Sequence, residues 1–323
     1  MYDVLTAFDI CVDFLIDLGT TVPEFGQKEK LVEGYGLEMG GSACIFACQC
    51  AKLGLITTGV GSRGDDSFGQ FMIDCLKRDG VDISHIRINK EKTALTLCLN
   101  KEGGDRSILT YMGAMDTVEG IWVEELLPKT RHLHICSYYL LKKLQSAYPS
   151  ILKKAKELGV TVSLDTNWDP DEKWDGGIGE VLPYVDIFLP NENELMLITG
   201  KNNIEDALHY AGEMVPTIAV KCGADGAYAY CKGVVYKCAA MKITVADTVG
   251  AGDSFNGGFI YGFLSGLSID QCLKYGTTCG SLNASKPGGT AGQPLLGEIT
   301  EPAVQDKTIA KAQSNGCANY GHR

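Results

Sequence analysis

Between residues 132 and 223 the sequence alternates between short apolar stretches and amphipathic ones: HLHICSYYL (132–140), SILKKAKELG (150–159), VTVSLD (160–165), DIFLPN (186–191), NELMLITG (193–200) and TIAVKCG (217–223). The first, third, fourth and last are short and rich in branched residues, as buried strands are, whereas the others have the spacing of helices. Strands that alternate with helices indicate a parallel sheet with helices on both faces. We therefore predict an α/β protein with a three-layer α/β/α body and a mainly parallel sheet.

Upstream of this stretch the same kinds of segment recur. The opening VLTAFDICVDFLI (4–16) is predicted as one strand, because it is rich in branched and aromatic residues. Residues 42–53, SACIFACQCAKL, are predicted as a buried helix that Gly54 ends. Residues 67–80, SFGQFMIDCLKRDG, have the pattern of an amphipathic helix.

Two segments, 14–38 and 91–115, do not fit the alternation. The second contains TALTLCLN, a KEGGDR turn and SILTYM, which is the pattern of a β-hairpin. We expect the two segments to form a small antiparallel sheet that projects from the body. The predicted organisation is one domain over residues 1–300 with these segments inserted, followed by a polar tail at 301–323.

The composition narrows the class of protein. Of 323 residues, 45% are hydrophobic and 21% charged, which is ordinary for a globular domain, and the net charge of −11 argues against nucleic acid or an anionic membrane as the main partner. The 13 cysteines are odd in number and scattered, and Cys44, Cys48 and Cys50 have no histidine nearby in sequence to complete a zinc site. The acidic N-terminus and the lack of a long apolar run favour a cytoplasmic protein.

The chemistry is carried by residues 247–258, DTVGAGDSFNGG. The turn at 250–252 consists of small residues that let backbone amides approach an anion, and it leads into a helical pattern whose N-terminus adds partial positive charge. This arrangement suits the charge on a transferring phosphoryl group. Asp253 follows the turn at once and could accept the proton of an attacking hydroxyl. The alternative is a tight turn with Asp253 as a helix N-cap. One face of the helix is expected to carry Phe255, Phe259 and Phe263.

This motif resembles the C-terminal signature of the ribokinase family, also called the PfkB carbohydrate kinases. Five further segments agree with that family in content and order over about residues 4–295. They are Gly40–Gly41 with KLG (52–54), GVGSRGDDSFG (59–69), PNENE (190–194), VKCGADGA (220–227) and KPGG (286–289). The resemblance implies the ribokinase-like fold with its β-sheet lid, ATP and Mg²⁺ as cofactors, a small polyol as substrate, a monovalent cation such as K⁺, and a homodimer formed through the lid.

The resemblance also assigns roles to individual residues. For catalysis it implies Asp253 as general base, with Gly250, Ala251 and Gly252 as anion hole. For the nucleotide and its magnesium it implies Asn191, Glu194, Lys221, Gly223, Gly226 and Thr277. For the substrate, Asp13, Gly40, Gly41, Asn167, Asp169 and Arg106 are the candidates. For a monovalent cation they are Asp247, Val249, Asn283 and Gly288. Purely structural roles stay open as alternatives. Glu194 could be a solvated helix residue, Asp13 could form a turn at the end of a strand, and Gly40 and Gly41 could form an ordinary loop.

Two positions depart from the family pattern. Ile45 stands where the N-terminal signature usually carries an asparagine that touches the sugar, so one hydrogen bond to the substrate is lost. Asp169, in DTNWDP (165–170), stands where the DxNxR stretch of related sugar and sugar-acid kinases carries an arginine. Because Asp13 and Asp169 are both expected to face the sugar, we predict a substrate that is not a carboxylate. Arg106, in the lid turn, is the cation that could overturn this prediction.

Three functions remain open from the sequence. The first is an ATP-dependent kinase that phosphorylates a hydroxyl of a sugar or sugar-like polyol. The second is a nucleoside kinase of the same fold, which would need aromatic residues of the lid to stack on a base. The candidates for such stacking are Phe14, Phe25, Tyr35 and Tyr111. The third is a catalytically weak binding or regulatory homologue, which Ile45 favours and the intact turn before Asp253 opposes.

Overall fold

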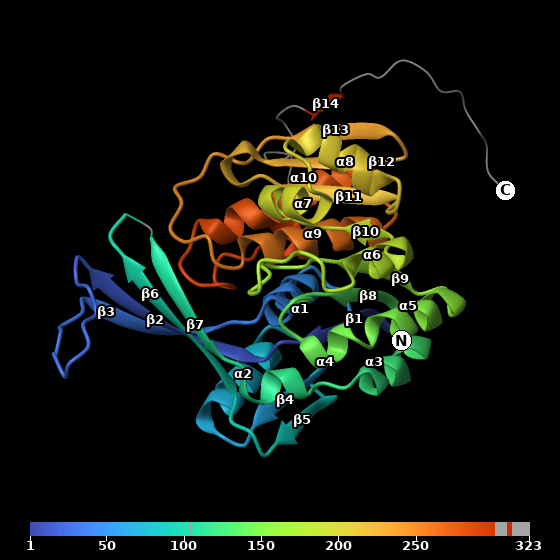
Figure 1. Ribbon diagram of the computed structural model, residues 1–323. Helices are drawn as coiled ribbons and strands as arrows, with labels where there is room; N and C mark the ends of the chain where they lie inside the picture. The colour runs from blue at the N-terminus through green and yellow to red at the C-terminus, as the bar shows by residue number, and fades with distance from the viewer. Residues whose placement is uncertain (104, 301–308, 312–323) are drawn as a thin grey trace.

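The computed structural model describes residues 1–103, 105–300 and 309–311, so the predicted tail at 301–323 lies almost wholly outside the described residues. Its main sheet comprises β1 (Tyr2–Phe8), β4 (Thr57–Gly64), β5 (Ile86–Asn89), β8 (Thr130–Ile135), β9 (Thr161–Leu164), β10 (Ile187–Phe188), β11 (Thr217–Lys221), β12 (Ala227–Cys231), β13 (Val234–Cys238) and β14 (Ile309–Lys311). The strand order is β14-β13-β12-β11-β10-β9-β8-β1-β4-β5 (Figure 1). Neighbours from β11 to β5 are parallel, which confirms the predicted mainly parallel sheet.

One edge of this sheet was not predicted. The strands β11 to β14 pair with one another in antiparallel fashion, so the alternation of strand and helix stops after Lys221. Strands β12 and β13 are joined by the two residues Lys232 and Gly233, which both have positive φ. Such a short connection can only join antiparallel neighbours.

Helices cover both faces of the sheet and complete the three layers. One face packs against α1 (Ser42–Lys52), α2 (Ser67–Arg78), α9 (Ala251–Leu264) and α10 (Ile269–Ala284). The other packs against α3 (Gly120–Leu126), α4 (Lys142–Gln145), α5 (Tyr148–Glu157), α6 (Ile178–Val181), α7 (Glu192–Thr199) and α8 (Ile204–Gly212). The short α11 (Leu296–Thr300) packs beside α10. Side chains of β1 alternate between the two cores, as expected for a strand buried on both faces. None of the helices in the described part of the chain is long and apolar enough to cross a membrane.

The opening of the chain forms two strands, so the prediction of a single strand over residues 4–16 is wrong. Strand β1 ends at Phe8 in the main sheet, and β2 (Cys11–Gly19) belongs to a second, 4-stranded sheet. The two residues between them, Asp9 and Ile10, are buried. Both strands are apolar and branched, so composition alone does not mark the break between them.

The second sheet projects from the body (Figure 1). It contains β2, β3 (Gly34–Met39), β6 (Ala94–Lys101) and β7 (Arg106–Tyr111) in the order β3-β2-β6-β7. Strands β6 and β7 form the hairpin that the sequence predicted. The sheet is mixed and not purely antiparallel, because β2 and β6 run parallel while the outer pairs are antiparallel. We call this sheet the lid.

Candidate active site

The predicted anion hole lies at the N-terminus of α9. Gly250 precedes the helix with φ of 70°, and a Cβ there would lie 2.5 Å from the carbonyl oxygen of Gly289. A larger residue is therefore excluded both by backbone conformation and by space. Ala251 and Gly252 begin the helix, so their amides belong to the first turn, where no intrahelical acceptor exists.

Asp253 lies in that same first turn and is 8% exposed. Burial and then the neighbouring Asp165 carboxylate raise the pKa of Asp253 well above its ordinary range, while Lys221 and a hydrogen bond from Ser42 act in the opposite direction. Raised basicity at the edge of an anion-binding turn is what a general base needs to accept a hydroxyl proton. The predicted aromatic face follows behind it, with the Phe255 and Phe259 rings stacked in the core.

An ion pair forms the floor beside this turn. Lys221, the last residue of β11, pairs with Asp165, the residue after β9, and Asn256 donates to the same Asp165 oxygen at 2.5 Å. Burial works to lower the pKa of Lys221, but Asp165 and Glu194 outweigh it and raise that pKa. The family resemblance implies a nucleotide contact for Lys221 but gives no role to Asp165 or Asn256. Asp165 stands within the quoted DTNWDP stretch, which was the available signal.

Asn191 and Glu194 form a capping box at the start of α7. Asn191 Oδ1 accepts from the Glu194 amide at 2.9 Å, and Glu194 Oε2 accepts from the Asn191 amide at 2.9 Å. Glu194 is 5% exposed, which excludes the alternative of a solvated helix residue. Burial and then Asp165 raise the pKa of Glu194. Asn191 also forms a parallel backbone β-bridge with Lys221. The capping box is therefore fixed next to the Lys221–Asp165 ion pair.

The paired glycines hold two aspartates close to the backbone. A Cβ on Gly40 would overlap the carboxylate of Asp13, and a Cβ on Gly41 would overlap the backbone of Asp9. Asp9 accepts from the Ser137 hydroxyl at 2.5 Å, and burial raises its pKa to about 6. Burial and then Asp9 raise the pKa of Asp13 to about 7. These contacts explain both glycines by the close approach of Asp13 and Asp9, a role that the sequence did not suggest, and the binding of substrate at Gly40 and Gly41 stays a prediction.

Asn167 and Asp169 have different surroundings. Asn167 donates to the Ser42 hydroxyl at 2.6 Å and accepts from the Ser137 amide at 3.0 Å, so it joins the loops around Asp253. The Asp169 carboxylate accepts from three backbone amides of its own loop at 2.8–3.0 Å and is 2% exposed. The expectation that Asp169 faces the sugar is therefore not supported, because its carboxylate shapes the loop instead. The donating amides belong to Asp171, Lys173 and Trp174.

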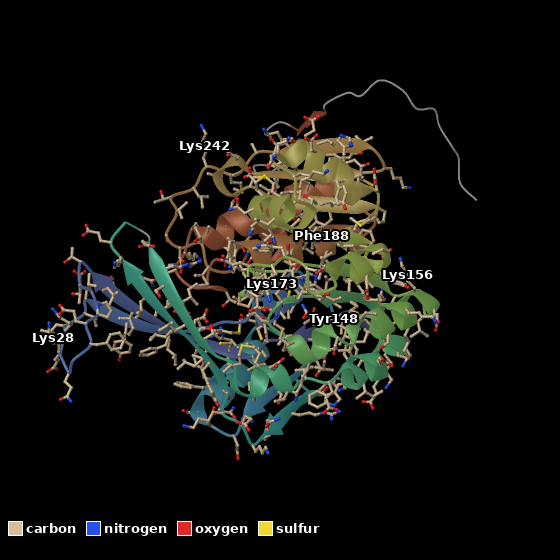
Figure 2. All side chains as sticks on the ribbon, in the orientation of Figure 1. Lys28, Tyr148, Lys156, Lys173, Phe188 and Lys242 are labelled. Carbon is tan, nitrogen blue, oxygen red and sulfur yellow. The ribbon has the colours of Figure 1, made fainter. Side chains whose placement is uncertain are left out.

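The register of the lid places Arg106 on the same face as Asp13. Asp13 pairs with Glu38 and Thr96, Thr96 pairs with Thr110, and Arg106 lies four residues before Thr110 on β7. Because successive residues of a strand alternate in direction, all five share one face. The Asp13–Gly40 contact shows that this face is turned toward the body. Figure 2 shows Lys28 at the far end of the lid, away from this region.

The lid aromatics occupy the opposite face. Phe14 adjoins Asp13 on β2 and therefore points the other way, and its ring lies 6.0 Å from that of Tyr35. Tyr111 pairs with Leu95, which places it on the Phe14 face. Phe25 is fully exposed in the loop between β2 and β3. In the described part of the lid, none of the four predicted aromatic residues therefore lies on the face that carries Asp13 and Arg106.

Ile45 is 3% exposed and packs beneath the anion hole. A Cβ on Gly250 would lie 2.9 Å from Ile45 Cγ2, and a Cβ on Gly289 would lie 2.7 Å from Ile45 Cδ1. The branched side chain thus fills the space between the turn and residue 289. It supports the anion hole sterically and offers no hydrogen bond.

The predicted nucleotide loop is built around close backbone contacts. Gly223 has φ of 54° and Gly226 φ of 89°, and a Cβ on Gly226 would overlap the carbonyl oxygen of Cys238. Thr277, on α10, donates its hydroxyl to the Leu273 carbonyl of its own helix at 2.8 Å. The Thr277 hydroxyl is therefore already used by its own helix.

The four predicted cation ligands do come together. Asp247 accepts from the amides of Val249 at 3.0 Å and Gly288 at 3.1 Å, and Asn283 donates to the Val249 carbonyl at 2.9 Å. Asn283 is fully buried, and among the residues that the structure describes its Oδ1 has no hydrogen-bond partner. A buried oxygen without a donor fits a cation among oxygen ligands. Glu38 of the lid lies against Gly288.

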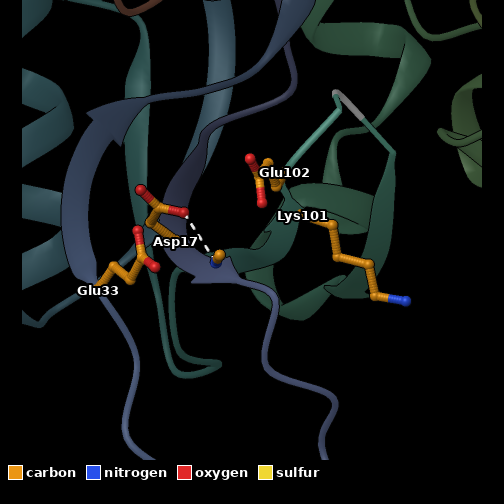
Figure 3. Close-up of a pocket in the computed structure, with 5 residues that line it drawn as sticks. Asp17, Glu33, Lys101 and Glu102 are labelled. Atoms are coloured by element: carbon orange, nitrogen blue, oxygen red, sulfur yellow. Dashed lines mark hydrogen bonds between the residues drawn. The ribbon is translucent and has the colours of Figure 1, made fainter.

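A separate pocket of about 320 Å³ lies at the far end of the lid (Figure 3). It is lined by Asp17, Gly19, Glu33, Lys101 and Glu102, and the Lys101 ammonium points away from the carboxylates. Its polar groups are mainly acidic, so it does not suit the phosphates of a nucleotide.

Comparison with known proteins identifies the family of this chain. A family model described as pfkB family carbohydrate kinase matches residues 5–295. The chain belongs to the pfkB family of carbohydrate kinases. A 5-dehydro-2-deoxygluconokinase of Bacillus licheniformis is 27% identical over 93% of this chain and 95% of that protein. An ATP-dependent ribose-1-phosphate kinase of Halopiger xanaduensis is 31% identical over 77% of this chain and 81% of that protein.

Solved structures of the family share the fold. A putative ribokinase II from E. coli, solved in complex with ATP and Mg²⁺, superposes with a TM-score of 0.79 at 25% identity, covering 93% of this chain and 98% of that one. The ribokinase of Arabidopsis thaliana, complexed with ribose and ATP, superposes with a TM-score of 0.80 at 23% identity over 95% of this chain and 99% of that one, and so supports the fold alone. The predicted ribokinase-like fold is therefore confirmed.

Proposed function

We propose that this protein transfers the γ-phosphoryl group of ATP to a hydroxyl of a sugar or sugar-like polyol, with Asp253 as general base. The observation that carries the proposal is a buried carboxylate with raised pKa in the first turn of α9, directly after a turn that only small residues can form. The ATP and Mg²⁺ named for the E. coli relative support the choice of cofactors.

In the proposed reaction the substrate hydroxyl oxygen forms a bond to the γ-phosphorus as the bond from that phosphorus to the bridging oxygen of ADP breaks. The hydroxyl proton passes to Asp253. The amides at 250–252 donate to the phosphoryl oxygens, where negative charge must be stabilised during transfer. Asp13 accepts hydrogen bonds from other hydroxyls of the substrate and so fixes which hydroxyl reaches Asp253.

The cofactor sites follow from the residues around this reaction. Asn191 and Glu194 are the residues that would hold magnesium through its water shell, and the fixed, buried Glu194 carboxylate fits that role. Bound magnesium supplies charge neutralisation on the phosphates. The residues that would hold potassium are Asp247, Val249, Asn283 and Gly288, since Asn283 Oδ1 has no other partner within residues 1–103, 105–300 and 309–311. Gly223 and Gly226 would let the nucleotide approach the backbone.

We further propose that the substrate is neutral, although the Bacillus licheniformis relative is named for a sugar acid. We call the face of the lid that carries Asp13, Glu38 and Arg106 its substrate face. Its two carboxylates, Asp13 and Glu38, outnumber the one arginine, Arg106. Asp169 supplies no positive charge at the position where related sugar and sugar-acid kinases carry an arginine. A substrate carboxylate would meet like charges in a partly desolvated site.

We propose two roles for the lid, one in closing the site and one in dimer formation. It would close over the sugar and exclude water, which limits hydrolysis of ATP. Its other face exposes large apolar side chains, with Tyr35 at 78% and Leu109 at 58% exposure, and would pair with the lid of a second copy. A homodimer through the lid is therefore the expected assembly.

The test is an assay that follows ADP release over a panel of neutral sugars, cyclic polyols, sugar acids and nucleosides. We expect ADP release with one or more sugars or polyols, in amounts matched by phosphorylated product. Phosphorylation of nucleosides alone would support the nucleoside kinase instead. Binding of ATP and sugars without any product would favour a weak binding homologue.

A further inference from the structure

The ion pair in the floor of the site is held from two sides. Asp165 Oδ2 accepts from both the Lys221 ammonium and Asn256 Nδ2, and the Lys221 ammonium lies 3.5 Å from Asn256 Oδ1. The Lys221 and Asp165 side chains are 14% and 4% exposed. The other Asp165 oxygen accepts from the Asn167 amide at 3.3 Å. A lysine would otherwise sample many rotamers, so these contacts fix the position of its charge.

The fixed ammonium lies beside the anion hole. A Cβ on Gly252 would lie 3.7 Å from Lys221 Nζ and 3.6 Å from its Cδ. Lys221 also acts on both neighbouring carboxyl groups, because it lowers the pKa of Asp253 and that of Glu194 against the effect of burial. The ammonium therefore lies beside the turn that would receive the phosphoryl group, and it is close enough to affect the pKa of Asp253 and that of Glu194.

Stability alone does not account for this arrangement. Burying two opposite charges costs desolvation that their attraction scarcely repays, and apolar replacements of such pairs are often as stable. A buried pair at the carboxyl edge of a parallel sheet, next to a helix N-terminus, lies where ligands of α/β proteins bind. Asp165 and Lys221 come from β9 and β11, which are separated in the sheet by β10.

We propose that Asp165, together with Asn256, positions the Lys221 ammonium to contact the phosphoryl group during its transfer to the substrate. Lys221 would then be a catalytic residue, while Asp165 and Asn256 would be positioning residues. The inference rests on the proposed kinase reaction and adds to it the side-chain cation that stabilises the transferring group. The ammonium has three N–H donors and contacts two side chains, Asp165 and Asn256, so it can donate to a phosphoryl oxygen while Asp165 keeps it in place.

Asp165 and Lys221 shift the pKa of Asp253 in opposite directions, so their removal should have opposite effects on the pH dependence of the rate. Asp165 raises the pKa of Asp253 and Lys221 lowers it. Each of these two effects is smaller than that of burial, which raises the same pKa. The rate requires ionised Asp253, so it falls as pH drops through that pKa. Asp165→Asn should move the acid limb of the kcat profile to lower pH, whereas Lys221→Met should move it to higher pH.

The first measurement needs no sugar substrate. Calorimetry gives the Kd of ADP and of a non-hydrolysable ATP analogue for the wild type, Asp165→Asn and Lys221→Met. We expect the wild type to prefer the analogue and Lys221→Met to lose roughly tenfold or more of that preference, as for a lost hydrogen bond to a charged group. The matched controls are Lys156→Met and Asp186→Asn, a 2.7 Å ion pair at the opposite end of β9. These controls should keep the wild-type preference.

The second measurement is kcat across pH with the best substrate of the panel. We expect Lys221→Met to lower kcat by about 10²–10³-fold, the usual cost of removing one stabilising group. The double variant Asp165→Asn/Lys221→Met removes both charges, so it should fold without an unpaired buried ion and still have low kcat. A double variant with wild-type kcat, or single variants with unmoved acid limbs, would overturn the inference and leave a structural pair.

Failure of the inference and failure of the proposed function are distinguishable. A wild-type protein that phosphorylates a sugar, while Lys221→Met keeps its preference for the ATP analogue, overturns the role of Lys221 and leaves the kinase function standing. A wild-type protein that binds neither nucleotide overturns both.

Discussion

Asp13 and Gly40 are in such close contact that the carboxylate of the first occupies the space of a Cβ on the second. Gly40 lacks the positive φ of Gly41, so a larger residue there is opposed by the aspartate and not by the backbone. Gly40→Ala should therefore displace Asp13 and raise the KM for the substrate by about tenfold, the cost of one hydrogen bond to a charged group. The affinity for an ATP analogue should stay unchanged.

The matched control is Gly36→Ala on β3, the strand that ends just before Gly40, where a Cβ would make an ordinary 3.8 Å contact with Leu15. Steady-state kinetics on both variants checks the prediction. An equal change of KM in the two would show that the strand, and not Asp13, is responsible.

Asp253→Asn should abolish turnover while nucleotide binding persists. The amide keeps the shape of the carboxylate but cannot take the hydroxyl proton, so kcat should fall by roughly 10²–10⁴-fold or more. Asp270→Asn, in the first turn of α10, is the control for a charge change at a helix start. Near-normal kcat in Asp253→Asn would contradict the assignment of the base.

The fold could be predicted from the sequence because its evidence is local. Each strand or helix of the body has its own periodicity, and the alternation between them already implies parallel pairing. The lid hairpin has a turn signal within six residues. The break after Phe8 could not be predicted, because β1 and β2 are both rich in apolar and branched residues although they join different sheets.

The site was predictable where a motif fixes the backbone and not where partners meet through the fold. Asp253 follows its turn directly in sequence. Asp165 and Lys221 are 56 residues apart and meet only because β9 and β11 end at the same edge of the sheet. The opposite error occurred at Asp169, since an aspartate that caps its own loop has the same local sequence as one that binds a ligand.

Potassium should raise the activity, and magnesium should be required. Asn283 Oδ1 and the Asp247 carboxylate offer oxygen ligands next to the anion hole, and a bound cation there would fix the loop that leads into α9. Rates in potassium, sodium and tetramethylammonium chloride at equal ionic strength test the first part, and excess EDTA the second. Equal rates in all three salts would remove the potassium site, and activity in EDTA would remove the need for magnesium.

Asp13 should make the protein less stable as the pH rises from about 4 to about 7. Burial and then Asp9 raise its pKa to about 7 in the folded protein, whereas the unfolded chain titrates near its ordinary value of about 3.9. The folded state therefore holds this proton more tightly, and its contribution to stability is complete below the unfolded pKa and lost through the folded one.

Asp13→Asn cannot ionise, so its thermal midpoint relative to that of the wild type should increase between pH 5 and pH 8. The control is Asp17→Asn, because Asp17 lies four residues after Asp13 on β2 and therefore on the same face of the lid. A constant difference across this range would contradict the shifted pKa of Asp13.

The last prediction concerns the charge of the substrate. A neutral sugar or cyclic polyol can donate several hydrogen bonds to Asp13 and Glu38, which share the substrate face of the lid. A sugar acid would bring its carboxylate toward them, with Arg106 as the cation of that face that could compensate. Arg106 is already attracted to Asp13, whose pKa it lowers against the effect of burial. Its charge is thus partly used before a substrate arrives.

We therefore expect higher kcat/KM for neutral hexoses, pentoses or cyclic polyols than for their aldonate and ketodeoxy-acid relatives. Arg106→Ala should then leave the neutral substrates largely unaffected, and Lys101→Ala, on the other side of the same hairpin turn, is the control for a lost lid cation. A clear preference for an acid would show that the chain follows its gluconate-named relatives. Loss of that preference in Arg106→Ala, but not in Lys101→Ala, would identify the lid arginine as the group that replaces the arginine missing at position 169.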